Sequence, residues 1–169
     1  MRWERLFADL EGQAEDEALA ERDALAADLR DEHWGSLAWR DLLGETVTLD
    51  VVGVGRISGD VVAHNATLVH LRTPALDHVV AVAAISAMVA THGEPRPQGT
   101  LTQRLGWAHV CRNAREDADD VRIARLDGGT HDGVVDVVGR DFVRLRSAST
   151  SDATVLVPYG AIGVLSIRR

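Results

Sequence analysis

The sequence contains no lysine, only one cysteine and few aromatic residues, and all 18 of its basic residues are arginine. The single cysteine, Cys111, cannot form a disulfide within the chain, so a reducing compartment is the simplest interpretation. The longest nearly apolar run, residues 79–90, is shorter than the ~18 residues that a membrane-spanning helix needs. Acidic residues interrupt the N-terminal stretch, where a signal peptide requires an unbroken apolar run. These absences predict a cytoplasmic protein that neither crosses nor binds a membrane.

The charge is acidic overall and unevenly distributed. The 169 residues carry a net charge of -8, and residues 1–40 hold 11 acidic and 5 basic side chains. Residues 121–169 hold 7 basic and 5 acidic side chains and are therefore mildly basic. The absence of lysine beside 23 alanines indicates the codon bias of a GC-rich genome. The choice of arginine is therefore weak evidence for phosphate binding.

Residues 1–35 show the spacing of an amphipathic helix. Apolar side chains recur there at steps of three and four residues, with acidic residues between them. The stripe consists of Trp3, Phe7, Leu10, Ala14, Ala18, Leu25 and Leu29. A strict heptad would place acidic residues on its seam, which disfavours a long coiled coil. The helix is expected either to pack on its own domain or to bind a partner through the larger apolar side chains at its N-terminal end, Trp3, Phe7 and Leu10.

The rest of the chain contains one β-pattern twice. Residues 55–71 are GRISGDVVAHNATLVHL, and residues 129–145 are GTHDGVVDVVGRDFVRL. When residue numbers of the first copy are raised by 74, its glycines and apolar residues match those of the second copy. After a loop that differs slightly in length, the match continues at an offset of 77, where Val80 corresponds to Val157. Apolar residues alternate with a period of two, so each copy is predicted to form five short strands.

A helix is expected before each copy, at residues 37–43 and residues 101–115. Closure into a barrel leaves no unpaired strand edges, and so many short, bent strands therefore favour barrels. The predicted fold is mainly β: a long N-terminal helix followed by two tandem five-stranded small barrels, each preceded by a helix. The predicted domains are the N-terminal helix, residues 1–35; the first barrel, residues 36–90; a linker, residues 91–99; and the second barrel, residues 100–169.

This pattern resembles the Sm-like fold, a small SH3-like barrel, in its glycines and in two short motifs. The second copy is similar to the bacterial Sm-like riboregulator family, host factor Q, where an aromatic-valine-x-leucine run closes the third strand, as Phe142, Val143 and Leu145 do here. The elements Ala84-Ile85 and Ala161-Ile162 resemble that family's joint between the last two strands. The resemblance implies that the fourth strand of one barrel pairs with the fifth strand of the next, so that one chain could form this junction internally.

The chain departs from that family at its uridine-binding lysine-histidine pair. The corresponding positions are Val82-Ala83 and Tyr159-Gly160, so the family's nucleotide-binding chemistry is not carried over. The opening MRWERLFADLE also resembles an uncharacterised actinobacterial family, some members of which carry a Fis-type regulator label. A Fis-type protein should end in a helix-turn-helix, whereas residues 155–167 have a strand pattern.

Catalytic, metal and cofactor sites are not predicted. Gly53, Gly55 and Gly59 are followed by a strand instead of the helix that a dinucleotide-binding loop needs. The seven histidines lack metal-ligand spacing, and His64 and His70 are expected to face solvent from their strands. No nucleophile motif is present. We therefore expect a protein that is not an enzyme, without cofactor, metal or small-molecule substrate.

Arginines of the second copy form the most prominent polar set. The candidate nucleic-acid-binding residues are Arg104, Arg112, Arg122, Arg144, Arg146 and Tyr159. Three interpretations remain open. The arginines could form a cross-strand charge ladder with Asp136 between Arg122 and Arg144, bind RNA phosphates beside a stacking Tyr159 or Trp107, or lie under the acidic N-terminal helix.

The expected function is that of a non-catalytic interaction or assembly protein that binds a protein partner or forms a homo-oligomer through edge strands. The candidate contact residues in the strands are Val80, Val82, Val164 and Leu165. The alternative is an RNA-binding protein that uses the arginine-rich second copy.

Overall fold

The computed structural model describes residues 19, 21–94, 105–147 and 153–168. Two compact units are present, Met1–Trp39 and Arg40–Arg169. In the first unit, residue 19 and residues 21–36 are helical, so the described part of the predicted N-terminal helix is present and reaches one residue past its expected end at residue 35. Leu25 and Leu29 are exposed on this helix. The predicted contact residues Trp3, Phe7 and Leu10 lie outside the described residues.

The second unit contains the repeated pattern as two sets of five strands, here called the first and second halves. The first half consists of β1 (Thr46–Val51), β2 (Gly55–His64), β3 (Leu68–Arg72), β4 (Leu76–Ala81) and β5 (Ile85–His92). The second half consists of β6 (Asp120–Arg125), β7 (Thr130–Val138), β8 (Phe142–Ser147), β9 (Thr154–Pro158) and β10 (Ile162–Arg168). The five-strand pattern predicted for each copy is confirmed.

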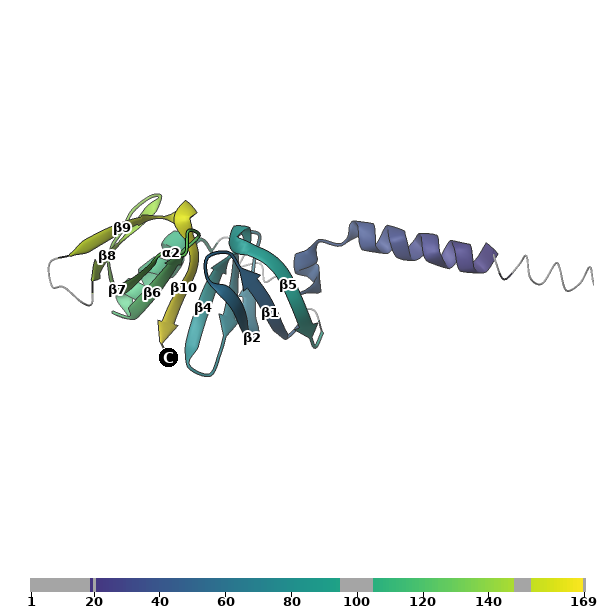
Figure 1. The fold of residues 1–169 in the computed structure, drawn as a ribbon, viewed down its shortest axis with the longest axis horizontal. Coiled ribbons are helices and arrows are strands. Elements are labelled where there is room, and N and C mark those ends of the chain that lie inside the picture. Colours follow the sequence, from purple (N-terminus) through teal and green to yellow (C-terminus); the bar gives the residue numbers. More distant parts are fainter. Residues whose placement is uncertain (1–18, 20, 95–104, 148–152, 169) are drawn as a thin grey trace, which may run out of the picture. The chain divides into compact units, whose positions relative to one another are not determined.

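The ten described strands form one continuous antiparallel sheet in the order β5-β1-β2-β3-β4-β10-β6-β7-β8-β9. The expected fold of two closed small barrels is therefore wrong. Closure would require β4 to pair within its own half, but β10 of the second half occupies that edge. The sheet is open, and its end strands are β5 and β9 (Figure 1). The pairing of a fourth strand with the fifth strand of the other copy, which the sequence resemblance implied, is confirmed.

The helices before the two halves also differ from expectation. The first half follows only a 3-10 turn, η1 (Trp39–Leu42), instead of a helix over residues 37–43. The second half follows α2 (Trp107–Glu116), which begins after the unwound Leu105 and Gly106; the front of the expected helix, residues 101–104, lies outside the described residues. Two short 3-10 turns, η2 (Val82–Ala84) and η4 (Tyr159–Ala161), separate the last two strands of each half.

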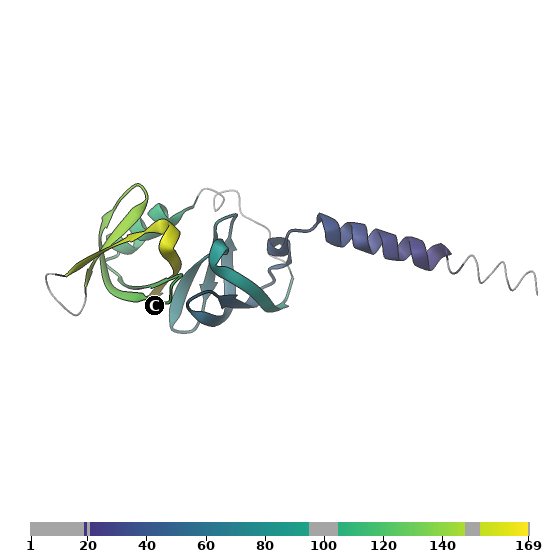
Figure 2. The same cartoon turned by 45° about the horizontal axis from the view of Figure 1, so that its top comes forward.

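Each half buries one face of its strands, and the turned view in Figure 2 shows how strongly these strands curve. In the first half, alternate residues of β1 and β3 are fully buried, among them Leu49, Val69 and Leu71. In the second half, Ile123, Leu145 and Leu165 form a core that Cys111 and Ala114 of α2 cover. This burial is what the alternation of apolar residues predicts for strands with one buried face.

The two halves meet through strand pairing and through a tight turn. Val80 of β4 lies opposite Val164 of β10, and both are buried. The turn between β1 and β2 contacts the turn between β6 and β7. A Cβ atom added at Gly53 would lie 2.6 Å from the carbonyl oxygen of Arg125 and 2.8 Å from the amide nitrogen of Gly128. Only glycine permits this close approach between the halves.

Replacement of Gly53 by alanine is expected to destabilise the contact between the halves. The φ angle of Gly53 is +74°, which costs an alanine about 1–2 kcal/mol. Overlap with the neighbouring backbone adds about 1–3 kcal/mol. The free energy of unfolding, measured by urea denaturation, should therefore fall by clearly more than the conformational cost alone.

Gly55 provides the matched control, because its φ angle is +96° and a Cβ atom added there meets no atom within 4 Å. Gly55→Ala should show the conformational cost without the overlap. Equal losses in the two variants would contradict a tight contact at Gly53.

Candidate functional site

The two end strands of the sheet carry exposed apolar side chains. Val89 on β5 is 50% exposed, and Leu156 on β9 is 55% exposed. Among the described residues, β5 pairs only with β1 and β9 pairs only with β8. The outer backbone edge of each strand is therefore available to another strand, and unpaired edges of this kind are sites of strand addition.

The contact residues predicted in the strands lie in or near the internal junction. Val80 and Val164 face each other there, and Leu165 is buried in the core of the second half. Val82 lies in η2 and is half-buried. Val80 and Val164 thus belong to the internal junction, and the exposed apolar residues of the outer strands were not singled out from the sequence.

A groove of about 240 Å³ lies beside the junction, between α2 and the outer face of the first half. Its lining is mainly apolar and includes Leu68, Val79, Val110 and Ile167. The polar residues around it are His64, Asn65, His70, Asp77, His109 and Asn113. The groove exists because β10 brings α2 of the second half over β3 and β4 of the first. Sequence reasoning could not find it, because its walls come from distant segments.

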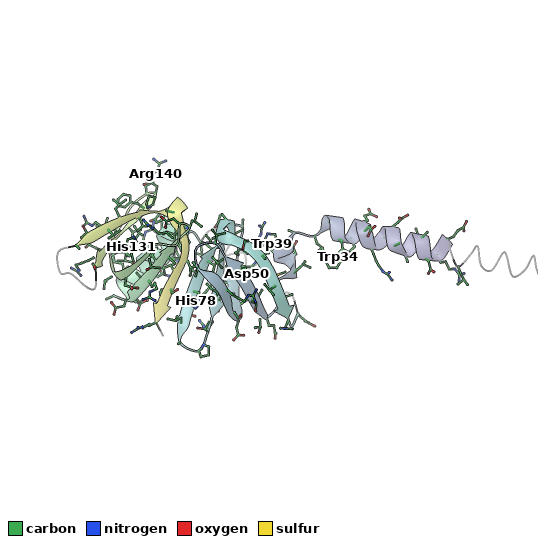
Figure 3. All side chains as sticks on the ribbon, viewed as in Figure 1. Trp34, Trp39, Asp50, His78, His131 and Arg140 are labelled. Atoms are coloured by element: carbon green, nitrogen blue, oxygen red, sulfur yellow. The ribbon has the colours of Figure 1, made fainter. Side chains whose placement is uncertain are left out.

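Histidines line both faces of the sheet next to this junction. His70 Nε2 lies 3.4 Å from Asp77 Oδ1, and Arg72 Nε donates a 2.9 Å hydrogen bond to the same oxygen. On the other face lies His78, which Figure 3 labels; its Nδ1 atom is 2.9 Å from Ser166 Oγ, and this contact joins β4 to β10. The expectation that His64 and His70 face solvent is wrong. His64 is 4% exposed, because a bulge between Val61 and Ala63 reverses the alternation of β2, and His70 borders the groove beneath α2.

Burial lowers the pKa of both junction histidines. For His70 the desolvation of the charged imidazolium outweighs the favourable charge of Asp77. Burial likewise lowers the pKa of His78, where Asp77 opposes the change and His70 adds to it. Burial acts to raise the pKa of Asp77, but the hydrogen bond from Arg72 and the proximity of His70 outweigh burial and lower it. Neutral imidazoles beside an ionised carboxylate are therefore favoured at neutral pH.

Asn65 fixes the loop between β2 and β3 and connects it to the second half. Its Oδ1 atom accepts hydrogen bonds from the amides of Thr67 and Leu68 at 2.8 and 2.9 Å. Its Nδ2 atom donates a 2.8 Å hydrogen bond to the carbonyl oxygen of Leu105, just before α2. This side chain holds one end of the groove in place.

The arginines of the second half form cross-strand ion pairs. Arg122 Nε lies 2.7 Å from Asp132 Oδ1, and Arg144 Nη2 lies 2.6 Å from Asp136 Oδ2. Cross-strand charge pairs are present, but the predicted ladder with Asp136 between Arg122 and Arg144 is wrong. Val135 lies opposite Leu145, so the next residue of β7, Asp136, comes beside Arg144, whereas the pairing of β6 with β7 sets Asp132 and not Asp136 opposite Arg122.

The other predicted nucleic-acid-binding residues come from different elements. Arg112 is exposed on α2 and Arg146 is exposed on β8, whereas Arg104 lies outside the described residues. Tyr159 is half-buried, and its hydroxyl donates a 3.0 Å hydrogen bond to the carbonyl oxygen of Gly139. Trp107 packs against the core of the second half. Both candidate stacking rings thus have structural roles.

Reactive groups are scarce in the described part of the chain. Cys111 is fully buried, and burial raises the pKa of its thiol to about 11, which makes it a poor nucleophile. Within the described ranges, no three histidine, cysteine, aspartate or glutamate side chains are close enough together to hold a metal ion. None of the described helices combines the length and the hydropathy needed to cross a membrane.

Comparison with known proteins found no matching family model and no matching curated protein.

Replacement of Asn65 by alanine should lower the free energy of unfolding by about 1–3 kcal/mol, because the amides of Thr67 and of the buried Leu68 lose their acceptor. Urea denaturation measures the change. Asn113→Ala is the matched control, since Asn113 is exposed on α2, and it should change stability by less than about 0.5 kcal/mol. Equal effects would show that Asn65 does not hold the loop.

Proposed function

We propose that the protein is a non-catalytic interaction and assembly protein that adds a strand of another polypeptide to the open edges β5 and β9. One observation carries the proposal. The two open edges are β5, the fifth strand of the first half, and β9, the fourth strand of the second half. Inside the chain, a fourth strand and a fifth strand already pair with each other, as β4 and β10. The exposed Val89 and Leu156 add apolar area at these edges.

A second copy of the chain is the partner that the internal junction favours. If β9 of one copy pairs with β5 of the next as β4 pairs with β10, the repeat defines the register. The pair Leu165–Val79 of the internal junction corresponds to Met88 opposite Leu156, and Val164–Val80 corresponds to Ala87 opposite Val157.

The register inferred from the β4–β10 junction applies to β5 only as far as Met88. The partners of β5 on β1 shift between Met88 and Ala90, because Val89 is an extra residue that β10 lacks. Such a contact joins different surfaces of the two copies, so it produces a closed ring or an open chain and not a two-fold dimer.

Light scattering at several concentrations tests self-assembly. The mean mass should rise with concentration, and Leu156→Lys should lower it by introducing a charge at the edge. Val52→Lys is the control, because Val52 is exposed on the turn after β1 and lies on neither edge. A strictly monomeric protein over the whole range would contradict self-assembly through the edges.

Disulfide trapping tests the register. In the double variant Met88→Cys, Leu156→Cys, oxidation should link successive copies covalently, because directly opposed residues meet disulfide distances. Ala87→Cys with Leu156→Cys is the matched control, since the Ala87 side chain points to the other face of β5. The native Cys111 will not compete, because it is buried and protonated. Equal linkage in the two variants would contradict this register.

RNA binding through the second half has less support. Arg122 and Arg144 are engaged in ion pairs with aspartates, and the net charge of the chain is -8. A gel shift with a random RNA pool at low salt separates the two functions. A shift that Arg144→Ala with Arg146→Ala abolishes would favour RNA binding.

A further inference from the structure

We propose that the junction between β4 and β10 is a proton-sensitive joint, in which protonation of His70 and His78 loosens the connection between the two halves. The proposal concerns the inside of one chain and does not depend on the function proposed for the outer edges.

The joint is a narrow connection with a titratable contact across it. In the described part of the chain, β4–β10 is the only strand pairing between the halves, and five residues of each strand take part. His78 contributes a side-chain hydrogen bond across this pairing, to Ser166. His70 lies on the neighbouring strand β3, on the opposite face. The two imidazoles thus flank the joint from both sides of the sheet.

The groups around His78 do not stabilise its charged form well. Across the sheet, His78 is paired with Leu71 on β3 and Ser166 on β10, and Ser166 is paired with Arg122 on β6. The nearest charge beyond the serine is therefore a cation, although Asp132 on β7 binds it. Asp77 is adjacent to His78 on β4 and offers a partly compensating charge.

Among the described residues around the groove, Asp77 is the only carboxylate near His70, and it is shared with Arg72. Asp77 on β4 faces His70 and also accepts the hydrogen bond from Arg72 on β3. The other titratable groups in the described lining of the groove are His64 on β2 and His109 on α2. Protonation of His70 would place a second cation beside Asp77, in a groove whose lining is mainly apolar.

The sign of the pH effect follows from these environments. Histidine in an unfolded or opened segment titrates near its ordinary value of about 6.5, whereas burial in the closed joint lowers the pKa of both imidazoles. As pH falls through about 6.5, histidines in the form with the joint open take up protons before those in the closed joint. The closed joint therefore loses stability relative to the open form. The closed form is most stable above about pH 7, where both forms are neutral.

The corresponding positions in the second half carry no histidine. His78 corresponds to Val155, and His70 corresponds to Arg144. A joint between β9 and β5 of two copies would therefore lack this response. Failure of self-assembly and failure of the proton-sensitive joint are thus separate outcomes.

Hydrogen exchange of the full-length chain between about pH 5 and pH 7.5 tests the joint. After correction for intrinsic exchange rates, protection of the β4 and β10 amides should fall at least about tenfold at the acidic end. The logarithm of protection should change by at most about two per pH unit, as expected when two histidines take up protons. Protection in β1, β2, β7 and β8 should change less. The double variant His70→Gln, His78→Gln should remove the pH dependence at the joint. His92→Gln, on exposed β5, should retain it.

The wild-type profile is decisive even if the double variant fails to fold. Protection of β4 and β10 that is unchanged across this range would overturn the proposal. So would an equal loss of protection in all strands, because it would indicate global unfolding, and so would an unchanged pH dependence in a folded double variant. An acid-induced loss confined to β4 and β10 supports it.

Discussion

The backbone pairing of β4 with β10 is the interaction on which the rest of the second unit depends. A fourth strand whose outer N–H and C=O groups lack partners must find another strand or remain an exposed edge. Here β10 satisfies that edge, and Val80 and Val164 bury apolar area at the same place. The pairing leaves β5 and β9 as the edges of the sheet, and it carries α2 over the first half to form the groove.

Two copies of one β-pattern have acquired different chemistry at equivalent positions. In the first half the residues beside the joint are His70 and His78, and burial disfavours their charged forms. The equivalent strands of the second half carry Arg144, which is paired with Asp136, and apolar residues on β9. The internal joint is therefore buried and titratable, whereas the outer edge is exposed and largely apolar. The same strand geometry thus forms a buried junction in one place and an open edge in the other.

The sequence predicted the strands well because alternation is a local property. The ten strands, the turns between them and the helix before the second half follow from the spacing of apolar residues and glycines. Two side-chain predictions were wrong, one of them because of a bulge. The bulge in β2 turns His64 inward; Asp136 missed Arg122 for another reason, since the register of β6 with β7 sets Asp132 opposite Arg122. A bulge adds one residue without changing composition, so periodicity alone could not locate it.

By itself, the sequence determined that one alternating segment occurs twice, that each copy makes five strands, and that no catalytic motif accompanies them. Only the tertiary structure decided that the copies merge into one open sheet, which side chains share the groove, and which strands remain at the edges. The physical reason is that alternation records which face of a strand is buried, whereas an edge can be satisfied by any strand of compatible register. The choice between closing a barrel and joining a neighbour is made by contacts between residues far apart in the chain, such as Val80 with Val164.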